Sequence, residues 1–472
     1  TIRRTSNIGE LMIILGTNSV KDTGFDVANS CRFDGSSSKL VKAQSAGNRD
    51  LWTYSVWIKW SAITTTTTTF FTSSDGSNLY AYMGIQSYKL RFLDYNSDNQ
   101  TNLITNRLFR DPSAWYHIVL AYDSAQGTDS NRVKLYVNGV QETSFSTETY
   151  PSSGLDSAVN VNSSNFIISS NQEQSSGSMW NGYMAESCFI DGTAYAATDF
   201  GEFDEDSGIW KPISVSGLTF GTNGFYLDFE DSANLGNDAN GGTDFTETGL
   251  AATDQSTDTC TNNFATLNPL NANIGATVPT LSEGNLRTSN SITNKMQTQY
   301  STLAPSTGKF YCEVKATAGS VFRIGISSYN SNQAQGSSDT QNRPGQFSEG
   351  WGYDKTGTIY KTESSIATYT AYNTGDIICI ALDMTNKKLY FRRNNNAWEN
   401  SANLATGSNG IDISSIPSGT GMAFGAGLEA GSVGAAYADF NFGSPPFSIS
   451  SGNTDGNGYG NMEYAIPSGY YV

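Results

Sequence analysis

Residues 115–140 read WYHIVLAYDSAQGTDSNRVKLYVNGV, and this stretch decides the fold. In a β-strand, successive side chains point to opposite faces of the sheet. Read as a strand, the first part places mainly apolar side chains on both faces: Trp115, His117, Val119 and Ala121 on one, and Tyr116, Ile118, Leu120 and Tyr122 on the other. The pattern therefore predicts an inner strand that is covered on both sides.

A polar loop over residues 123–131 separates this strand from a second one. There Val133, Leu135 and Val137 alternate with more polar neighbours, which predicts a half-buried strand. The Asn138-Gly139 pair that follows supplies the positive φ angles of a tight hairpin turn. An inner strand and its hairpin partner need a second sheet to cover them, so the stretch predicts a β-sandwich.

Two other segments share a family resemblance with this one. Residues 51–60 read LWTYSVWIKW and residues 182–192 read GYMAESCFIDG. Together with the Trp-Tyr-His opening at 115–117 and LYVNG at 135–139, they resemble the laminin-G-like or concanavalin-like lectins. The resemblance covers roughly residues 25–200. It implies a jelly-roll sandwich of a kind that serves mostly for binding and only sometimes for catalysis.

Composition limits the function. Of 472 residues, 37% are hydrophobic and 12% aromatic, which is typical of sandwiches with many short strands and turns. The net charge of −17 disfavours binding to nucleic acid through its phosphates, so we expect no nucleic-acid partner. No apolar run reaches the length of a membrane span, and residues 1–11 lack the apolar core of a signal peptide. We therefore expect no membrane partner.

The five cysteines are widely spaced along the chain: Cys31, Cys188, Cys260, Cys312 and Cys379. An odd number with no close pair argues against a disulfide framework or a zinc site. We predict buried free thiols, which suit a protein that folds in a cytoplasm.

The alternation ends near Ala194, and a different kind of sequence follows. Residues 199–212 read DFGEFDEDSGIWKP, residues 221–236 read GTNGFYLDFEDSANLG, and residues 258–270 read DTCTNNFATLNPL. This combination is similar to a module of bacteriophage structural proteins, especially from marine phages, which joins a lectin-like sandwich to a following domain. The resemblance implies a virion protein, and we predict an irregular linker over residues 201–280.

A second set of strand patterns follows the linker. In order, the chain carries GKFYCEVK at 308–315, FRIGIS at 322–327, GWGYDKTGTIY at 350–360, GDIICIAL at 375–382 and KLYFR at 388–392. This order resembles the SPRY family over roughly residues 281–445, which implies another concanavalin-like sandwich.

The predicted fold class is thus all-β, with two concanavalin-like antiparallel β-sandwich (jelly-roll) domains joined by an irregular linker. Residues 1–24 are predicted as an N-terminal strand or anchor, 25–200 as the first sandwich, 201–280 as the linker, 281–445 as the second sandwich and 446–472 as a glycine-rich tail.

Candidate catalytic residues are few. His117, the single histidine, sits within the inner strand and is best explained as a packed core residue. Glu202, Asp204 and Asp206 alternate, and paired carboxylates hydrolyse glycosides. However, the pattern departs from the Glu-x-Asp-x-x-Glu strand of glucanases, because position 207 is serine. We predict solvated or turn-forming acids and no enzyme.

Binding residues are only weakly indicated. Tyr95 and Trp398 fall near predicted strand ends, where aromatic rings could stack on sugars, although packing at the core or rim is the stronger interpretation for both. Loop aspartates at 75, 123 and 129 leave calcium open, but turn formation is the normal role of such residues, and no metal site or cofactor is predicted.

The sequence favours a structural and adhesion protein of a phage virion: a tail fibre, a tail-associated protein or a capsid-surface component. Assembly in the host cytoplasm, a homotrimer, contacts with other virion proteins and with host-surface glycan are expected. Two alternatives stay open: a glucanase-like polysaccharide depolymerase acting through Glu202 and Asp204, and a cellular adhesin or secreted lectin.

Overall fold

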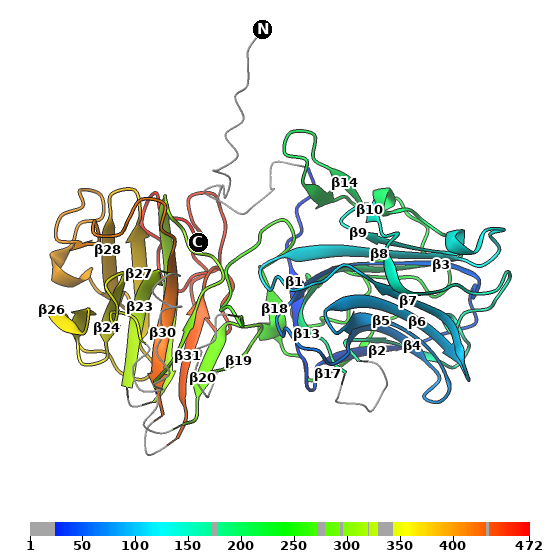
Figure 1. Cartoon of the computed structure of the whole chain (residues 1–472), viewed down its shortest axis with the longest axis horizontal. Coiled ribbons are helices and arrows are strands. Elements are labelled where there is room, and N and C mark those ends of the chain that lie inside the picture. Colours follow the sequence, from blue (N-terminus) through cyan, green and yellow to red (C-terminus); the bar gives the residue numbers. More distant parts are fainter. Residues whose placement is uncertain are drawn as a thin grey trace, which may run out of the picture.

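The computed structural model describes residues 24–170, 178–270, 279–292, 296–319, 321–328, 343–430 and 434–472. Within these ranges the regular structure is almost entirely β, and the strands form two sandwiches that lie side by side (Figure 1). The predicted all-β fold with two antiparallel sandwiches is confirmed. The N-terminal strand or anchor predicted over residues 1–24 lies outside the described residues, except for Gly24.

Two eight-stranded sheets make the first sandwich. One has the order β10-β9-β8-β3-β13-β1-β18, with β16 paired to β13: β1 (Ser30–Asp34), β3 (Leu51–Trp60), β8 (Trp115–Asp123), β9 (Val133–Val137), β10 (Val140–Gln141), β13 (Asn181–Asp191), β16 (Phe225–Leu227) and β18 (Gln255–Ser256). The other has the order β11-β7-β6-β5-β4-β12-β2-β17: β2 (Lys39–Ala43), β4 (Thr68–Ser74), β5 (Leu79–Gln86), β6 (Lys89–Asn96), β7 (Asn99–Thr105), β11 (Phe145–Thr149), β12 (Asn165–Ile168) and β17 (Thr246–Thr248).

The stretch at 115–140 folds as its pattern predicts. β8 is buried along both faces, and β9 alternates between buried and half-buried residues. Asn138 and Gly139 adopt φ angles of 48° and 77°, so the hairpin turn forms at the predicted pair. Aromatic contacts then fill the space between the sheets; the Tyr54 and Phe71 rings stack with centroids 4.1 Å apart.

A layer formed by residues 195–220 covers the outer face of β3, β8 and β13. Its apolar side chains pack on outward-facing residues of those strands in a separate buried cluster, which includes Trp57, Val119, Phe200, Trp210 and Phe220. β14 (Gly201–Phe203) and β15 (Trp210–Pro212) form a two-stranded hairpin within this layer. This layer is why β8 is apolar on both faces.

The stretch predicted as a linker, residues 201–280, is short of regular structure, yet much of it is not a free connector. β16, β17 and β18 pair with β13, β2 and β1, so they extend both sheets of the first sandwich. Phe225, Leu227, Phe229, Leu235 and Phe245 are all buried in its core. These strands could not be predicted from the sequence, because each is only two or three residues long and shows no alternating pattern.

A seven-stranded and a six-stranded sheet make the second sandwich. The first has the order β19-β20-β31-β22-β27-β28-β29: β19 (Thr280–Ser282), β20 (Arg287–Asn290), β22 (Lys309–Ala318), β27 (Ile377–Asp383), β28 (Lys388–Arg393), β29 (Ile411–Asp412) and β31 (Ala436–Asn441). The second has the order β21-β30-β23-β24-β25-β26: β21 (Met296–Tyr300), β23 (Val321–Ser328), β24 (Gly350–Asp354), β25 (Thr358–Lys361), β26 (Ser364–Thr368) and β30 (Met422–Glu429). Short 3₁₀ turns complete the described structure: η2 (Asp129–Asn131), η3 (Ala197–Asp199), η4 (Ala252–Asp254) and η5 (Glu399–Ser401). None of the described helices is long and apolar enough to cross a membrane.

The glycine-rich tail, residues 446–472, packs onto the second sandwich. Met462 and Tyr470 are buried against Tyr311, Cys379 and Tyr390, which face outward from β22, β27 and β28. The buried carboxylate of Glu313 accepts the backbone N–H groups of Glu463 and Tyr464. The tail is therefore a covering layer, held by a buried acceptor.

A buried ion pair fixes the connection between the sandwiches. Lys59 Nζ on β3 lies 2.7 Å from Asp258 Oδ2 and also donates to Asn263 Oδ1 and the Phe264 carbonyl. Trp115 Nε1 donates to the other oxygen of Asp258 at 3.0 Å. Since Phe264 belongs to the core of the second sandwich, this network ties the first sheet to the chain that enters the next domain.

We expect Asp258→Asn to destabilise the protein by about 3–5 kcal/mol, because it leaves the Lys59 ammonium buried without a counter-charge. Urea unfolding measures the change. Asp156→Asn is the matched control: its pair with Arg49 is exposed, so a loss below about 1 kcal/mol is expected. Equal losses in the two variants would contradict the role of the buried pair.

Candidate functional site

The outer face of the β5–β6 hairpin carries a row of tyrosine rings. Ala81, Met83 and Ile85 of β5 point into the core, so period-two alternation turns Tyr80 and Tyr82 to the opposite face. Tyr80 pairs directly with Tyr95 on β6, which places the rings of all three tyrosines together.

Geometry defines this surface as a stacked ladder. The Tyr80 and Tyr95 rings lie 4.9 Å apart at 21°, and the Tyr80 and Tyr82 rings lie 6.4 Å apart at 11°. The guanidinium of Arg91 lies 5.6 Å from the centre of the Tyr82 ring. We call Tyr80, Tyr82, Tyr95 and Arg91 the tyrosine platform.

Electrostatics keep the platform neutral apart from Arg91. Burial raises the pKa of Tyr82, and burial together with the neighbouring Tyr95 raises the pKa of Tyr80, so both phenols stay protonated at neutral pH. Within the described chain, none of the three phenolic hydroxyls forms a hydrogen bond. Arg91 is held in place, since Nε donates to Asn102 and Nη1 to Gln86.

Of the two aromatic candidates from the sequence, only Tyr95 joins this surface. Tyr80, Tyr82 and Arg91 were missed, although folding residues 79–96 about the turn at 87–88 would have set Tyr80 opposite Tyr95. Trp398 lies on the second sandwich, packed edge-on to Tyr390 and with its ring centre 4.9 Å from the Arg392 guanidinium. There it belongs to the cluster that the tail covers.

The three acidic candidates lie on the exposed β14–β15 hairpin and its turn. Glu202 and Asp204 share one cation, with Lys211 Nζ at 3.2 and 3.3 Å. Hydrogen bonds from the backbone and hydroxyl of Ser207 lower the pKa of Asp204 to about 2, the opposite of what a general acid needs. Asp206 is exposed. The arrangement is that of a solvated turn, as the sequence predicts.

Another acid has the raised pKa that this hairpin lacks. Glu186 sits at the bulge of β13 with φ of 51°, and Tyr226 donates to its Oε2 at 2.6 Å. Desolvation raises the pKa of Glu186 to about 8, so it is protonated at neutral pH. Its side chain is buried beside Tyr226, so it is a packed, protonated acid.

His117 is also a packed residue. Its ring is stacked on Trp57 at 4.7 Å, Trp210 Nε1 donates to Nδ1, and Nε2 contacts Ser55 Oγ at 2.8 Å. Since Nδ1 accepts a hydrogen bond, the neutral tautomer carries its proton on Nε2. Desolvation lowers the pKa of His117 to about 3.

The loop aspartates do not converge. Asp75, Asp123 and Asp129 each bond to nearby groups of their own turns. Among the described residues, no three His, Cys, Asp or Glu side chains gather in a way that could hold a metal ion. All five cysteines are free, and all are buried except the half-buried Cys260.

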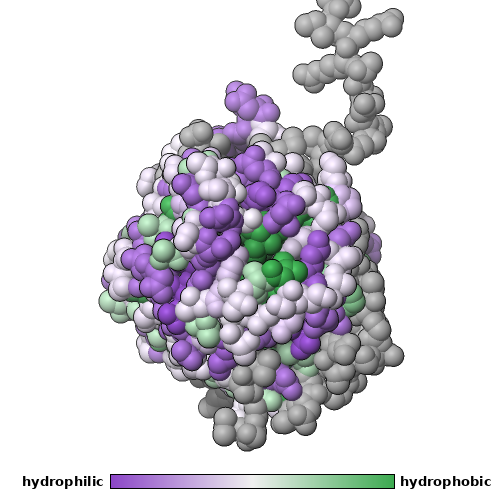
Figure 2. Space-filling view, turned by 90° about the vertical axis from the view of Figure 1, so that its left-hand side faces the viewer, coloured by the Kyte–Doolittle hydropathy of each residue, from purple (hydrophilic) through white to green (hydrophobic). Residues whose placement is uncertain are grey.

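Figure 2 views the second sandwich from the side that faces away from the first. That side is mainly hydrophilic, with one small apolar area. Ile366 on the edge strand β26 is 47% exposed, and single apolar side chains of this kind are normal on a protein surface.

Two β-sandwiches, one of them with a row of tyrosines on an outer sheet face, define a protein whose domains fit a binding role. Comparison with known families agrees with this class. Residues 33–194 match the laminin-G-type model described as the concanavalin A-like lectin/glucanases superfamily, and residues 309–408 match the SPRY domain. The chain thus carries a concanavalin-like domain followed by a SPRY domain. No curated protein matches the chain.

Solved structures are similar to parts of the chain. The SPRY domain of human HERC1 is 12% identical and aligns over 37% of this chain and 96% of its own, with a TM-score of 0.28. Domain 4 of the extracellular arabinanase AbnA of Geobacillus stearothermophilus is 16% identical over 38% and 82%, with a TM-score of 0.26. A putative carbohydrate-binding protein of Bacteroides ovatus is 16% identical over 47% and 58%, with a TM-score of 0.31.

The buried His117 predicts a pH-dependent stability. The pKa of His117 in the folded protein lies below the unfolded value of 6.5. Its contribution to the free energy of unfolding is therefore complete above pH 6.5 and is lost as pH falls toward 3, by up to about 1.4 kcal/mol per pH unit. Asp94 and Glu186 act in the opposite sense, since burial raises the pKa of the former to about 6 and of the latter to about 8.

The comparison is therefore between wild type and His117→Gln, with urea unfolding measured from pH 7 to pH 4. We expect the variant to be less stable at pH 7, and we expect the difference in free energy of unfolding between the two proteins to narrow toward pH 4. A gap that stays constant with pH would show that His117 titrates normally.

Proposed function

We propose that this chain is a binding protein whose tyrosine platform holds a neutral glycan, and that it serves as a structural and adhesion component of a bacteriophage particle. The observation that carries the binding proposal is the stacked ladder of Tyr80, Tyr82 and Tyr95 on an outer sheet face. Aromatic faces offer large, rigid apolar area to the C–H face of a sugar ring.

Polar groups around the ladder supply orientation. The free phenolic hydroxyls donate to sugar oxygens, and Arg91, Gln86 and Asn102 already form a fixed network beside Tyr82. A few placed polar groups around an apolar surface are typical of ligand sites. The sheet is rigid, so binding costs little ordering of the backbone.

The phage assignment rests on the sequence of residues 199–270, which resembles a module of phage structural proteins. The two domain types fit a binding role and leave the particle unspecified. A weak single platform gains strength when repeated in a symmetric oligomer, for which a homotrimer is our proposal, with other virion proteins and host-surface glycan as partners.

Tyr80→Ala and Tyr95→Ala are expected to weaken glycan binding by roughly tenfold or more each, because each removes one stacking face. A broad array of neutral oligosaccharides identifies a ligand, and calorimetry with that ligand measures the change. Tyr437→Ala serves as the matched control, since Tyr437 is a half-buried tyrosine of the second sandwich that packs on Arg287. A loss that is equal in all three variants would remove the platform from the proposal.

The particle assignment has its own test. Mass spectrometry of purified phage particles that encode the chain is expected to detect it at a fixed copy number, together with known structural proteins. Its absence from particles, with the chain found instead on a cell surface or in the medium, would leave a cellular adhesin or secreted lectin.

A further inference from the structure

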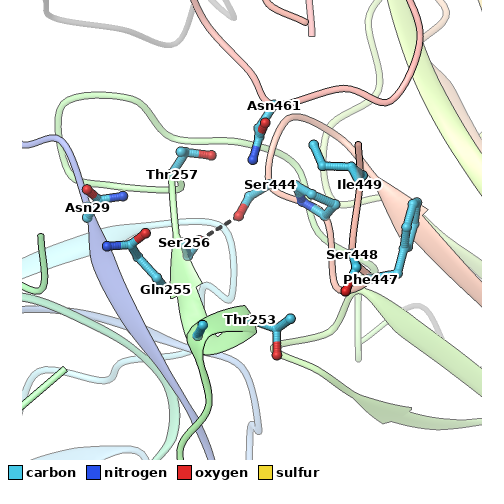
Figure 3. Close-up of a pocket in the computed structure, with 12 residues that line it drawn as sticks. Asn29, Thr253, Gln255, Ser256, Thr257, Ser444, Phe447, Ser448, Ile449 and Asn461 are labelled. Atoms are coloured by element: carbon cyan, nitrogen blue, oxygen red, sulfur yellow. Dashed lines mark hydrogen bonds between the residues drawn. The ribbon is translucent and has the colours of Figure 1, made fainter. Parts of the chain in front are cut away.

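A second feature that suggests ligand binding lies between the sandwiches, away from the tyrosine platform. It is a cleft of about 180 Å³, lined by residues at the edge of the first sandwich and by the segment that follows β31 (Figure 3). Ser256 bonds to Ser444 at 2.7 Å, and the Thr257 hydroxyl donates to the Gly443 carbonyl at 2.9 Å. These bonds join the two walls, so the cleft has a fixed shape.

Several polar groups in the cleft have no partner within the described chain. The side-chain amides of Asn29 and Asn461 form no hydrogen bond there, nor do the hydroxyls of Thr253 and Ser448. Gln255 donates both amide hydrogens to the Phe229 and Glu230 carbonyls. These bonds fix the orientation of the side chain, and its Oε1 remains available as an acceptor. In Figure 3, Asn29 and Gln255 lie on one side, Phe447 and Ser448 on the other, and Asn461 between them at the top.

The chemistry of the lining selects a class of ligand. No side chain that lines the cleft is ionisable, so a charged ligand would lose its hydration without gaining a counter-charge. Amides and hydroxyls both donate and accept, as the adjacent hydroxyls of a sugar require. Phe447 and Ile449 add apolar surface. The volume is below the roughly 300–1,000 Å³ of sites for drug-sized ligands, which limits the occupant to one small ring.

We propose that this cleft binds a single neutral sugar unit, or a cyclic polyol of that size, in contact with both sandwiches. Such a ligand would bridge Gln255 and Asn29 on one wall to Asn461 on the other. The site is independent of the tyrosine platform, because it uses different residues on a different edge of the first sandwich.

Saturation-transfer NMR on the full chain tests the proposal. The probes are the methyl glycosides of glucose, galactose and N-acetylglucosamine at millimolar concentration, with methyl glucuronide as the anionic comparison. We expect saturation transfer to at least one neutral glycoside and none to the glucuronide. The expected transfer persists in the Tyr80→Ala/Tyr95→Ala variant and falls at least fivefold in Asn461→Leu.

Thr253→Val provides a second cleft variant, since the residue is exposed and the change preserves its shape; it is expected to weaken binding while leaving the unfolding midpoint unchanged. No transfer to any neutral glycoside in the wild type would overturn the proposal. So would equal transfer in wild type and both cleft variants, or preferential binding of a capped neutral tripeptide. Transfer lost only in the platform variant would overturn the cleft site and support the platform. Oligosaccharide binding that survives in the platform variant would overturn the platform and support the cleft site.

Discussion

The buried pair of Lys59 and Asp258 is the constraint on which the arrangement of this protein depends. Both side chains are almost wholly buried, and desolvation lowers the pKa of Lys59 and raises that of Asp258. Two charges are retained inside only where their remaining bonds are satisfied. Here the three ammonium donors meet Asp258, Asn263 and the Phe264 carbonyl, so the chain must leave the first sandwich along one path.

Further bonds at the junction and a covering layer on each sandwich determine which surfaces stay accessible. Phe264 enters the second core directly after the ion pair, and Asn285 and Tyr183 add bonds across the junction, to the Ser61 and Gly284 carbonyls. Residues 195–220 cover the outer side of β3, β8 and β13, while the tail covers the outer side of β22, β27 and β28. Among the described residues, no such apolar layer packs on the tyrosines at the outer face of β5 and β6, where Tyr80 and Tyr95 are half-buried and Tyr82 is 8% exposed.

The strands with a clear alternating pattern could be predicted from the sequence, whereas the short strands that depend on pairing with distant partners could not. β3, β8, β9 and β13 were placed correctly, because period-two apolar patterns over several residues admit few alternatives. β16, β17 and β18 were not recognised, since strands of two or three residues carry no measurable period and depend on neighbours distant in sequence. The tail was predicted only as glycine-rich, although its Met462 and Tyr470 fill the space over Tyr311.

The residues of the candidate sites also differ in how far they could be predicted from the sequence. Tyr95 was identified alone, because an aromatic residue near a strand end is visible in the sequence, whereas its stacking on Tyr80 requires the register of the hairpin. Asn29 and Asn461 could not be connected at all, since they are 432 residues apart and meet only after both sandwiches have folded and docked.

The charge of the protein narrows the ligands that these surfaces suit. The chain carries 44 acidic and 27 basic residues, so a polyanion approaching it meets net repulsion that salt weakens only beyond a Debye length of about 8 Å. The tyrosine platform offers one cation, Arg91, which already bonds to Gln86 and Asn102, and the cleft offers none. An acidic polysaccharide would therefore lose hydration in the cleft without finding a counter-charge, and would find only Arg91 at the platform. Neutral sugars avoid that cost, since stacking on tyrosine and bonding to amides need no charge, and their binding to either surface should vary little with ionic strength.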